Sequence, residues 1–278
     1  MPTPGDNALR HVAALSSGPA LDPALRVTLN FHPDRAGVLA ALAETGTYLS
    51  QFVTGTSNGG LTAHPGGDRW RWESRIFGGA YDAAPARERP VYGALNFRRS
   101  AVGAAPRFGS AHLRLTGDVL RRTTFCYPDS TFEPTAFGVA AKMSLIELAE
   151  ADHPDALDGY VEAQVHGPVR LDRDVEALVL DPSFRGTEVE RAAERLPCPV
   201  EWHGGFALSV EVLREYPGFR GQQVVDLGAR IAVDGWLTPQ ILGEAVALGR
   251  YDARELKWVW HCLARFGTGH PGSAYLHH

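Results

Sequence analysis

The order of apolar and polar positions predicts many short strands and few helices over the first three-quarters of the chain. Alternation, the pattern of a strand with one buried face, is found in segments 26–31 and 160–165. Further strand-like segments are 91–97, 111–115, 123–127, 169–171, 177–180 and 200–202. Helical spacing is found at 7–15, 34–46, 143–149 and 188–196. In the second of these helices, Asp34 is expected to be the N-cap and Gly46 to follow the last turn. The order of elements predicts an α+β core without regular strand–helix–strand alternation.

The pattern changes after about residue 210, where consecutive helices are predicted. Residues 222–233 have helical spacing, and Thr238 followed by proline begins a second helix. Asp252 begins a third helix as part of a capping box. We therefore expect a core of residues 1–208 and a small helical C-terminal subdomain of residues 209–278.

Residues 48–76 show little periodicity and are rich in Gly, Ser, Thr and Asn. A loop of this length inside a compact chain is usually functional. Within it, the run 51–60 offers backbone N–H groups and small polar side chains that can cradle a pyrophosphate, which makes Ser57 and Asn58 candidates. No Gly-Lys-Ser/Thr occurs there, so the run is not a P-loop. An ordinary surface loop is the alternative, but three arginines follow closely and favour a function: Arg69, Arg71 and Arg75.

The composition allows a large apolar core and argues against general nucleic-acid binding. The chain has 278 residues, of which 44% are hydrophobic and 21% charged, with a net charge of −5. Proteins that bind nucleic acids generally, without a local basic groove on an otherwise acidic surface, usually have a net positive charge. Positive charge is almost entirely arginine, which suits a phosphate-rich ligand, although a GC-rich coding sequence produces the same bias.

Several common kinds of site are not predicted. The three cysteines are far apart, and the histidines form no HExxH pair, so neither a disulfide framework nor a catalytic metal is expected. No GxGxxG follows a strand, and no GxSxG motif occurs. The first 14 residues lack an apolar signal segment, and no apolar run is long enough for a membrane span. These features predict a cytoplasmic protein without membrane contact.

The strongest local candidate is the segment 160–167, Tyr-Val-Glu-Ala-Gln-Val-His-Gly. In a strand, Tyr160, Glu162 and Gln164 point to one face, and the small apolar residues between them point to the other. The apolar face is expected in the core, and the polar face lines a cleft. An exposed strand edge with routine polar residues is the alternative interpretation.

The order of elements after this segment resembles the C-terminal half of the ADP-ribosyltransferase fold. A turn, short strands, a helix and a further strand follow in sequence, and the likeness is closest to the toxin branch that modifies DNA bases. The resemblance covers residues 25–205 and implies a split antiparallel sheet around a cleft that binds NAD. In that family the catalytic glutamate lies in a polar-Glu-apolar strand, which implies that Glu162 is the catalytic carboxylate. The whole chain also looks like a bacterial family known only as a domain of unknown function.

The same resemblance implies further NAD contacts. The first strand of the fold ends in a residue that binds ribose or phosphate, a place taken here by His32 with Arg35 nearby. The middle strand presents an aromatic ring to nicotinamide, a place taken by Tyr92. Asn96 and Gln164 complete the expected contacts. A turn histidine at position 32 and a core tyrosine at position 92 remain open alternatives.

These observations predict an NAD-dependent ADP-ribosyltransferase or NAD glycohydrolase. A carboxylate beside the ribose stabilises the oxocarbenium-like transition state when the nicotinamide–ribose bond breaks. The acceptor could be a nucleic acid, a protein, a small molecule or water. Two alternatives stay open: a phosphotransferase of the same fold acting on RNA 2′-phosphate, and a degenerate, non-enzymatic binding or immunity module.

Overall fold

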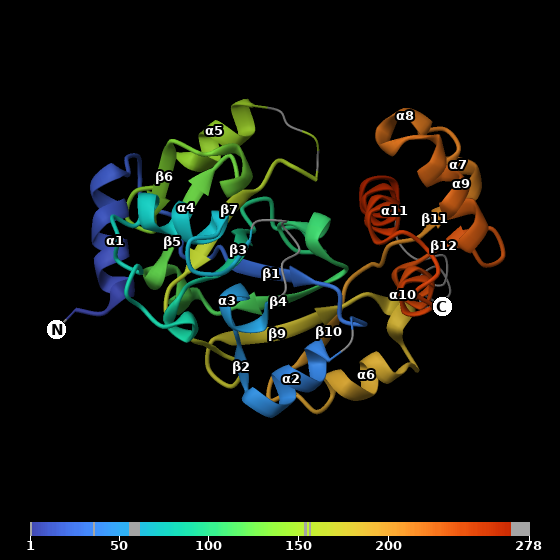
Figure 1. The fold of residues 1–278 in the computed structure, drawn as a ribbon, viewed down its shortest axis with the longest axis horizontal. Helices are drawn as coiled ribbons and strands as arrows, with labels where there is room; N and C mark the ends of the chain where they lie inside the picture. Colours follow the sequence, from blue (N-terminus) through green and yellow to red (C-terminus); the bar gives the residue numbers. More distant parts are fainter. Residues whose placement is uncertain (1, 36, 56–61, 153–154, 156, 268–278) are drawn as a thin grey trace.

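The computed structural model describes residues 2–35, 37–55, 62–152, 155 and 157–267, and it shows an α+β protein. A large mixed sheet forms the centre of the larger part, and a group of helices from the C-terminal quarter lies at one end of it (Figure 1). None of the helices in the described ranges is long and apolar enough to span a bilayer. The α+β class expected from the sequence is therefore confirmed.

Within the described ranges, eight strands form the central sheet, and all neighbouring strands but one pair are antiparallel. Their order is β10 (Val200–Trp202), β9 (Val175–Leu180), β4 (Ala111–Leu115), β1 (Val27–Phe31), β3 (Val91–Leu95), β7 (Val161–Val165), β5 (Thr123–Tyr127) and β6 (Ala136–Val139). The parallel pair is β9 and β10, which are joined through α6 (Glu188–Ala193). The sequence predicted these three elements, but not the parallel pairing of the two strands. Strand β6 was not predicted either.

The sheet is weakest in its middle, between β1 and β3. These strands pair over two residues only, Val27 with Leu95 and Thr28 with Ala94. By contrast, β1 pairs with β4 over four residues, and β3 pairs with β7 over five. The described strands therefore form one continuous sheet in which the β1–β3 ladder ends after Thr28, and the split sheet implied by the resemblance is not confirmed.

The two faces of β7 follow the predicted alternation. Val161, Ala163 and Val165 are fully buried in the main apolar core, which α2 (Val38–Thr45) and α5 (Leu145–Ala151) help to cover. The opposite face carries the polar residues of the strand. Near β5 and β6, that face is covered by α1 (Pro4–Leu15) and α4 (Asp68–Ile76), which share a second apolar cluster with Cys126 and Val139.

The described parts of the stretch 48–76 contain more regular secondary structure than the sequence predicted. It contains the end of a short strand, β2 (Thr47–Tyr48), which pairs with β8 (Val169–Arg170), then α3 (Gln51–Thr54) and α4. Helix α4 buries Arg69, Trp72, Glu73 and Ile76, the three- and four-residue spacing of an amphipathic helix. Two of these four residues are charged, so a search for apolar periodicity misses the helix. The candidates Ser57 and Asn58 lie outside the described residues.

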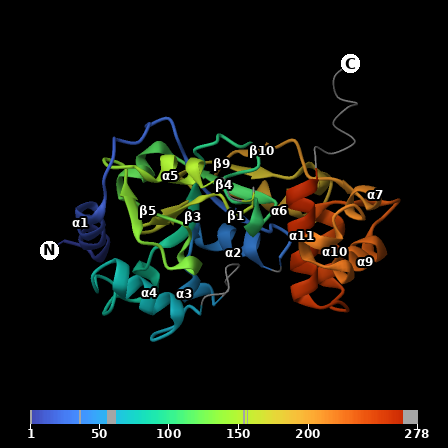
Figure 2. The same ribbon diagram turned by 90° about the horizontal axis from the view of Figure 1, so that it is seen from above.

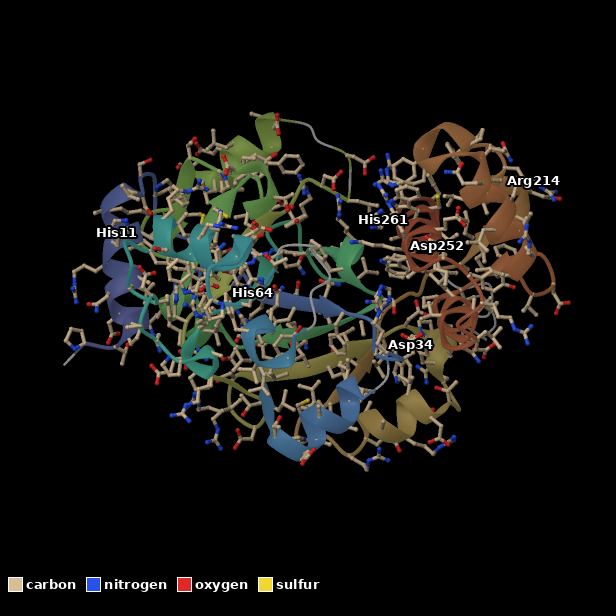
Figure 3. All side chains as sticks on the ribbon, viewed as in Figure 1. His11, Asp34, His64, Arg214, Asp252 and His261 are labelled. Atoms are coloured by element: carbon tan, nitrogen blue, oxygen red, sulfur yellow. The ribbon has the colours of Figure 1, made fainter. Side chains whose placement is uncertain are left out.

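The expected capping role of Asp34 is wrong. Helix α2 begins after Gly37, whose φ of +82° is left-handed, and no side chain caps it. Asp34 instead lies against α10 (Pro239–Ala247), where a Cβ added to Gly243 would be 1.5 Å from Asp34 Oδ2. Figure 3 labels Asp34 on the side of the core that faces these C-terminal helices. The predicted helix end at Gly46 is confirmed, since its N–H bonds the carbonyl of Leu42.

The C-terminal helices have an apolar core of their own, and Figure 2 shows them grouped at one end of the molecule. They are α7 (Val210–Leu213), α8 (Pro217–Arg220), α9 (Gln222–Ile231), α10 and α11 (Ala253–Phe266), with a two-stranded ladder of β11 (Leu208–Ser209) and β12 (Trp236–Leu237). Thr238 and Asp252 cap α10 and α11 as predicted. Helix α11 contacts the core through Trp260, whose Nε1 donates to the carbonyls of Pro106 and Arg107 at 3.0 and 3.1 Å.

Candidate functional site

A cavity of about 680 Å³ lies where the β1–β3 ladder ends. Its wall includes the end of β1 and the turn after it, parts of α2, α3 and α4, the start of β3, the turn after β5, and the first half of β7. Among the sequence candidates, His32, Arg35, Tyr92 and Glu162 all line this cavity. Residues up to 130 positions apart in the chain, His32 and Glu162, thus line one cavity.

Glu162 is buried in the cavity wall with hydrogen-bond donors on both carboxylate oxygens. It is 7% exposed. Oε2 accepts from the backbone N–H of Ser130 at 3.3 Å and from its hydroxyl at 2.9 Å, and Oε1 accepts from the amide of Gln164 at 3.0 Å. Burial raises the pKa of Glu162, while the Arg69 guanidinium, 4.0 Å from Oε1, acts to lower it. The hydrogen bonds therefore stabilise the ionised form of Glu162, whereas burial disfavours that form.

A second carboxylate, Asp129, lines the same cavity and was not predicted from the sequence. Its Oδ2 accepts a hydrogen bond from the hydroxyl of Tyr160, and its Oδ1 accepts from the N–H of Thr131 at 2.8 Å. The negative charge of Asp129 is among the causes that raise the pKa of Glu162, so the two carboxylates interact electrostatically. The sequence signal that could have identified Asp129 is the Asp-Ser pair in the loop just after β5, because functional side chains are common in such loops.

Arg69 is the third charged residue of the site, and α4 presents it. Its side chain is almost fully buried, Nη1 donates to the Ser130 hydroxyl at 2.7 Å, and the guanidinium lies 4.0 Å from the centre of the Tyr92 ring. Burial opposes the charge, but the neighbouring Tyr92, Glu162 and Glu73 outweigh it and raise the pKa of Arg69. Arg69 is therefore a fixed cation beside Glu162.

Tyr92 is held in place by groups behind the cavity wall. Its hydroxyl donates to Glu73 Oε1 at 2.8 Å, and Glu73 Oε2 accepts from Arg89 at 2.5 Å. Since Arg69 also lies over the ring, the tyrosine is fixed on two sides. Its position in the wall agrees with the sequence prediction, and contact with nicotinamide stays a prediction.

His32 and Arg35 follow the C-terminal end of β1. The imidazole of His32 is half-buried and meets the indole of Trp260 edge to face, with 5.0 Å between the ring centres. Burial, together with the nearby charge of Arg35, lowers the pKa of His32 to about 3. The imidazole is therefore neutral near pH 7. Arg35 is exposed and lies in the cavity lining, where it can approach an anionic group.

Two other candidates do not line the cavity. Asn96 lies in the turn after β3, where its side chain donates to the carbonyl of Ser100 at 2.9 Å and accepts from the N–H of Ser100 at 2.8 Å. Gln164 is 1% exposed and lies behind Glu162. Both side chains make internal contacts, so neither is placed to touch a ligand in the cavity. No group of three or more metal-binding side chains occurs within the described part of the chain.

The model of a family described as "Protein of unknown function (DUF3626)" matches residues 26–150 and 139–266. Together these two segments span most of the chain, including the central sheet, the cavity and the C-terminal helices. The chain belongs to the DUF3626 family. No curated protein matches the chain. In this DUF3626 protein the matched residues include both the cavity-bearing core and the helical part.

Proposed function

We propose that this DUF3626 protein binds NAD in the cavity and cleaves the bond between nicotinamide and ribose. ADP-ribose then passes to an acceptor or to water, on a fold of the ADP-ribosyltransferase type. The observation that carries the proposal is the buried Glu162 carboxylate, whose two oxygens are held by Ser130 and Gln164 in the wall of a cavity large enough for a substrate.

The charges in the cavity wall support a ligand that is positive at one end and negative at the other. Glu162 is in register with Ala94, which pairs with Thr28 near the beginning of β1. Arg35 follows the other end of β1. The carboxylates and Arg35 therefore occupy different parts of the wall. NAD has a cationic nicotinamide riboside and an anionic pyrophosphate, which suits this arrangement.

Glu162 supplies the main chemical contribution. Positive charge grows on the ribose as the bond to nicotinamide breaks, and a nearby carboxylate stabilises that charge more strongly in a buried site than in water. Arg69 and the donors from Ser130 and Gln164 favour the ionised form of Glu162, against the burial that raises its pKa. No reorganisation of solvent is then needed when the bond breaks.

Asp129 is placed to assist the acceptor. Its carboxylate lines the same cavity as Glu162, and Tyr160 fixes its orientation through a hydrogen bond. In a transfer reaction, the acceptor hydroxyl or amine loses a proton as it attacks the ribose, and a carboxylate within reach can take that proton. Two carboxylates with different neighbours can thus take different roles, with Glu162 stabilising the ribose cation and Asp129 accepting the proton of the acceptor.

The test is to measure nicotinamide release from NAD by the purified protein. Glu162→Gln should fold normally and lower the rate by on the order of 10²–10³. A matched control is Glu201→Gln, a strand residue of β10 that pairs with Arg114 and does not line the cavity. Release unchanged in Glu162→Gln contradicts the assignment of Glu162. NAD binding without any release would favour the non-enzymatic alternative.

A further inference from the structure

A continuous row of hydrogen bonds runs through the protein interior to Glu162. Tyr81 Oη lies 2.8 Å from His166 Nδ1, and His166 Nε2 lies 3.0 Å from Thr124 Oγ1. Thr124 Oγ1 lies 2.9 Å from Gln164 Oε1, and Gln164 Nε2 lies 3.0 Å from Glu162 Oε1. All four contacts are buried, so water does not compete with them.

The direction of each bond follows from the chemistry of its ends. An ionised Glu162 only accepts, so Gln164 presents its NH₂ group to Glu162 and its oxygen to Thr124. The Thr124 hydroxyl then donates its single proton to Gln164 and accepts from His166 Nε2–H. His166 Nδ1 is left to accept from Tyr81. Every donor therefore points toward Glu162, and bonds aligned in this way strengthen one another.

The far end of the row is fixed by aromatic packing. The ring of Tyr81 stacks on His166 with 5.8 Å between centres and an angle of 12°, and Phe77 meets the same imidazole edge to face at 5.1 Å. Burial, followed by the charge of Arg122, lowers the pKa of His166 to about 3. The imidazole is therefore neutral above about pH 4, and the direction of the row does not change near pH 7.

Gln164 is the strongest donor to one of the two oxygens of Glu162. The other groups near Oε1 are the thiol of Cys126 at 3.8 Å and the Arg69 guanidinium at 4.0 Å. Without the row, Gln164 could rotate and Oε1 would lose its one close donor. Oε2 would keep its bonds to Ser130.

We propose that Gln164, Thr124 and His166 are positioning residues, which hold the carboxylate of Glu162 in the orientation it needs toward the cavity. The proposal deepens the function proposed above and, for its catalytic part, rests on it. The row gives Gln164 a purpose different from the ligand contact predicted from the sequence. It reaches from Tyr81, just after α4, through β5 to the cavity-facing strand β7.

The test compares Thr124→Val with Thr123→Val, its neighbour in β5. Both threonines are buried, at 1% and 0% exposure, and each hydroxyl donates one internal hydrogen bond. Thr123 donates to the carbonyl of Val119, away from the row. Thr124→Val should lower kcat for nicotinamide release roughly tenfold or more with little change in KM, because an aligned donor to a charged group is weakened. Thr123→Val should keep the parent kcat. Equal kcat in the two variants would overturn the proposal.

A second measurement does not depend on NAD cleavage. The free energy of unfolding is measured against pH in each variant, with and without Glu162→Gln. The Glu162-dependent part of the curve reports the titration of that carboxylate, which is also influenced by Arg69 from α4, Asp129 after β5, Cys126 in β5 and Tyr92 in β3. Because Glu162 has a raised pKa, its ionisation removes stability as pH rises.

In Thr124→Val this loss should be larger and extend to a higher pH than in Thr123→Val, since the ionised carboxylate has lost a donor and its folded-state pKa rises further. If the curves of unfolding free energy against pH coincide in the two variants, the row of hydrogen bonds does not influence Glu162, whether or not NAD is a substrate. If the parent protein releases no nicotinamide but the curves separate, the proposed function fails and the positioning row stands. Gln164→Met serves as a second variant should Thr124→Val fold poorly, with the same expected shift.

Discussion

Replacing Gly93 by alanine tests the place where the sheet opens into the cavity. Gly93 lies in β3 opposite Ala163 of β7, and it also lines the cavity. A Cβ at this position would lie 2.4 Å from Leu29 Cδ2 and 2.6 Å from the backbone oxygen of Thr28. The leucine methyl can rotate away, but the carbonyl of Thr28 belongs to the backbone of β1 and cannot.

The magnitude follows from these two contacts. Overpacking of this kind costs ~1–3 kcal/mol, and a backbone collision belongs near ~3 kcal/mol. Alanine also restricts the unfolded chain, which offsets ~0.5–1 kcal/mol of that cost. The net loss is then ~2 kcal/mol, or a fall in Tm of roughly 4–8 °C for a protein of this size.

Thermal unfolding followed by circular dichroism measures this loss. The matched control is Gly204→Ala, where an added Cβ meets nothing within 4 Å and φ is not left-handed. That variant should keep the parent Tm or raise it slightly. If Gly93→Ala unfolds at the same temperature as Gly204→Ala, then β1 and β3 do not approach each other as closely as described.

Further predictions concern the surroundings of the cavity. Arg89→Met leaves the fully buried Glu73 without its 2.5 Å partner and should cost ~3–5 kcal/mol in urea denaturation, whereas Arg191→Met, on an exposed helix, should change little. Burial raises the pKa of Asp34 to about 6, so ionisation of Asp34 lowers the stability of the folded protein as pH rises from about 4 through 6. Asp34→Asn should therefore be as stable as the parent protein near pH 4 and more stable than it at pH 7.5. Trp260→Phe keeps the ring contact but loses the donor to two carbonyls, so chemical denaturation should show a loss of ~1–3 kcal/mol.

The sequence predicted most strands and the C-terminal helices because their signals are local. In β7, alternation alone placed Val161, Ala163 and Val165 in the core and Glu162 on the other face. Thr238 and Asp252 were identified as N-caps because a capping side chain bonds a neighbour two or three residues away. Such features depend little on the rest of the fold.

The parts that were missed depend on contacts distant in sequence. Helix α4 buries two charged residues, which is stable only because Glu73 meets Arg89 and Tyr92, and Arg69 meets Ser130. No pattern within the sequence of α4 predicts these partners, because Arg89, Tyr92 and Ser130 lie outside the helix. Asp129 was missed for the same reason, since its role depends on lying beside Glu162, which is 33 positions away in the chain.

The contact between His32 and Trp260 has a consequence for the order of synthesis. His32 emerges from the ribosome well before the indole that packs against it, because that indole belongs to α11. N-terminal parts of a protein generally begin to fold while the rest is still being made. The histidine side of the cavity can therefore acquire its final packing only after α11 has been synthesised. A nascent chain that stops before residue 253 has the carboxylates of the site and His32, but it lacks the indole against which His32 packs.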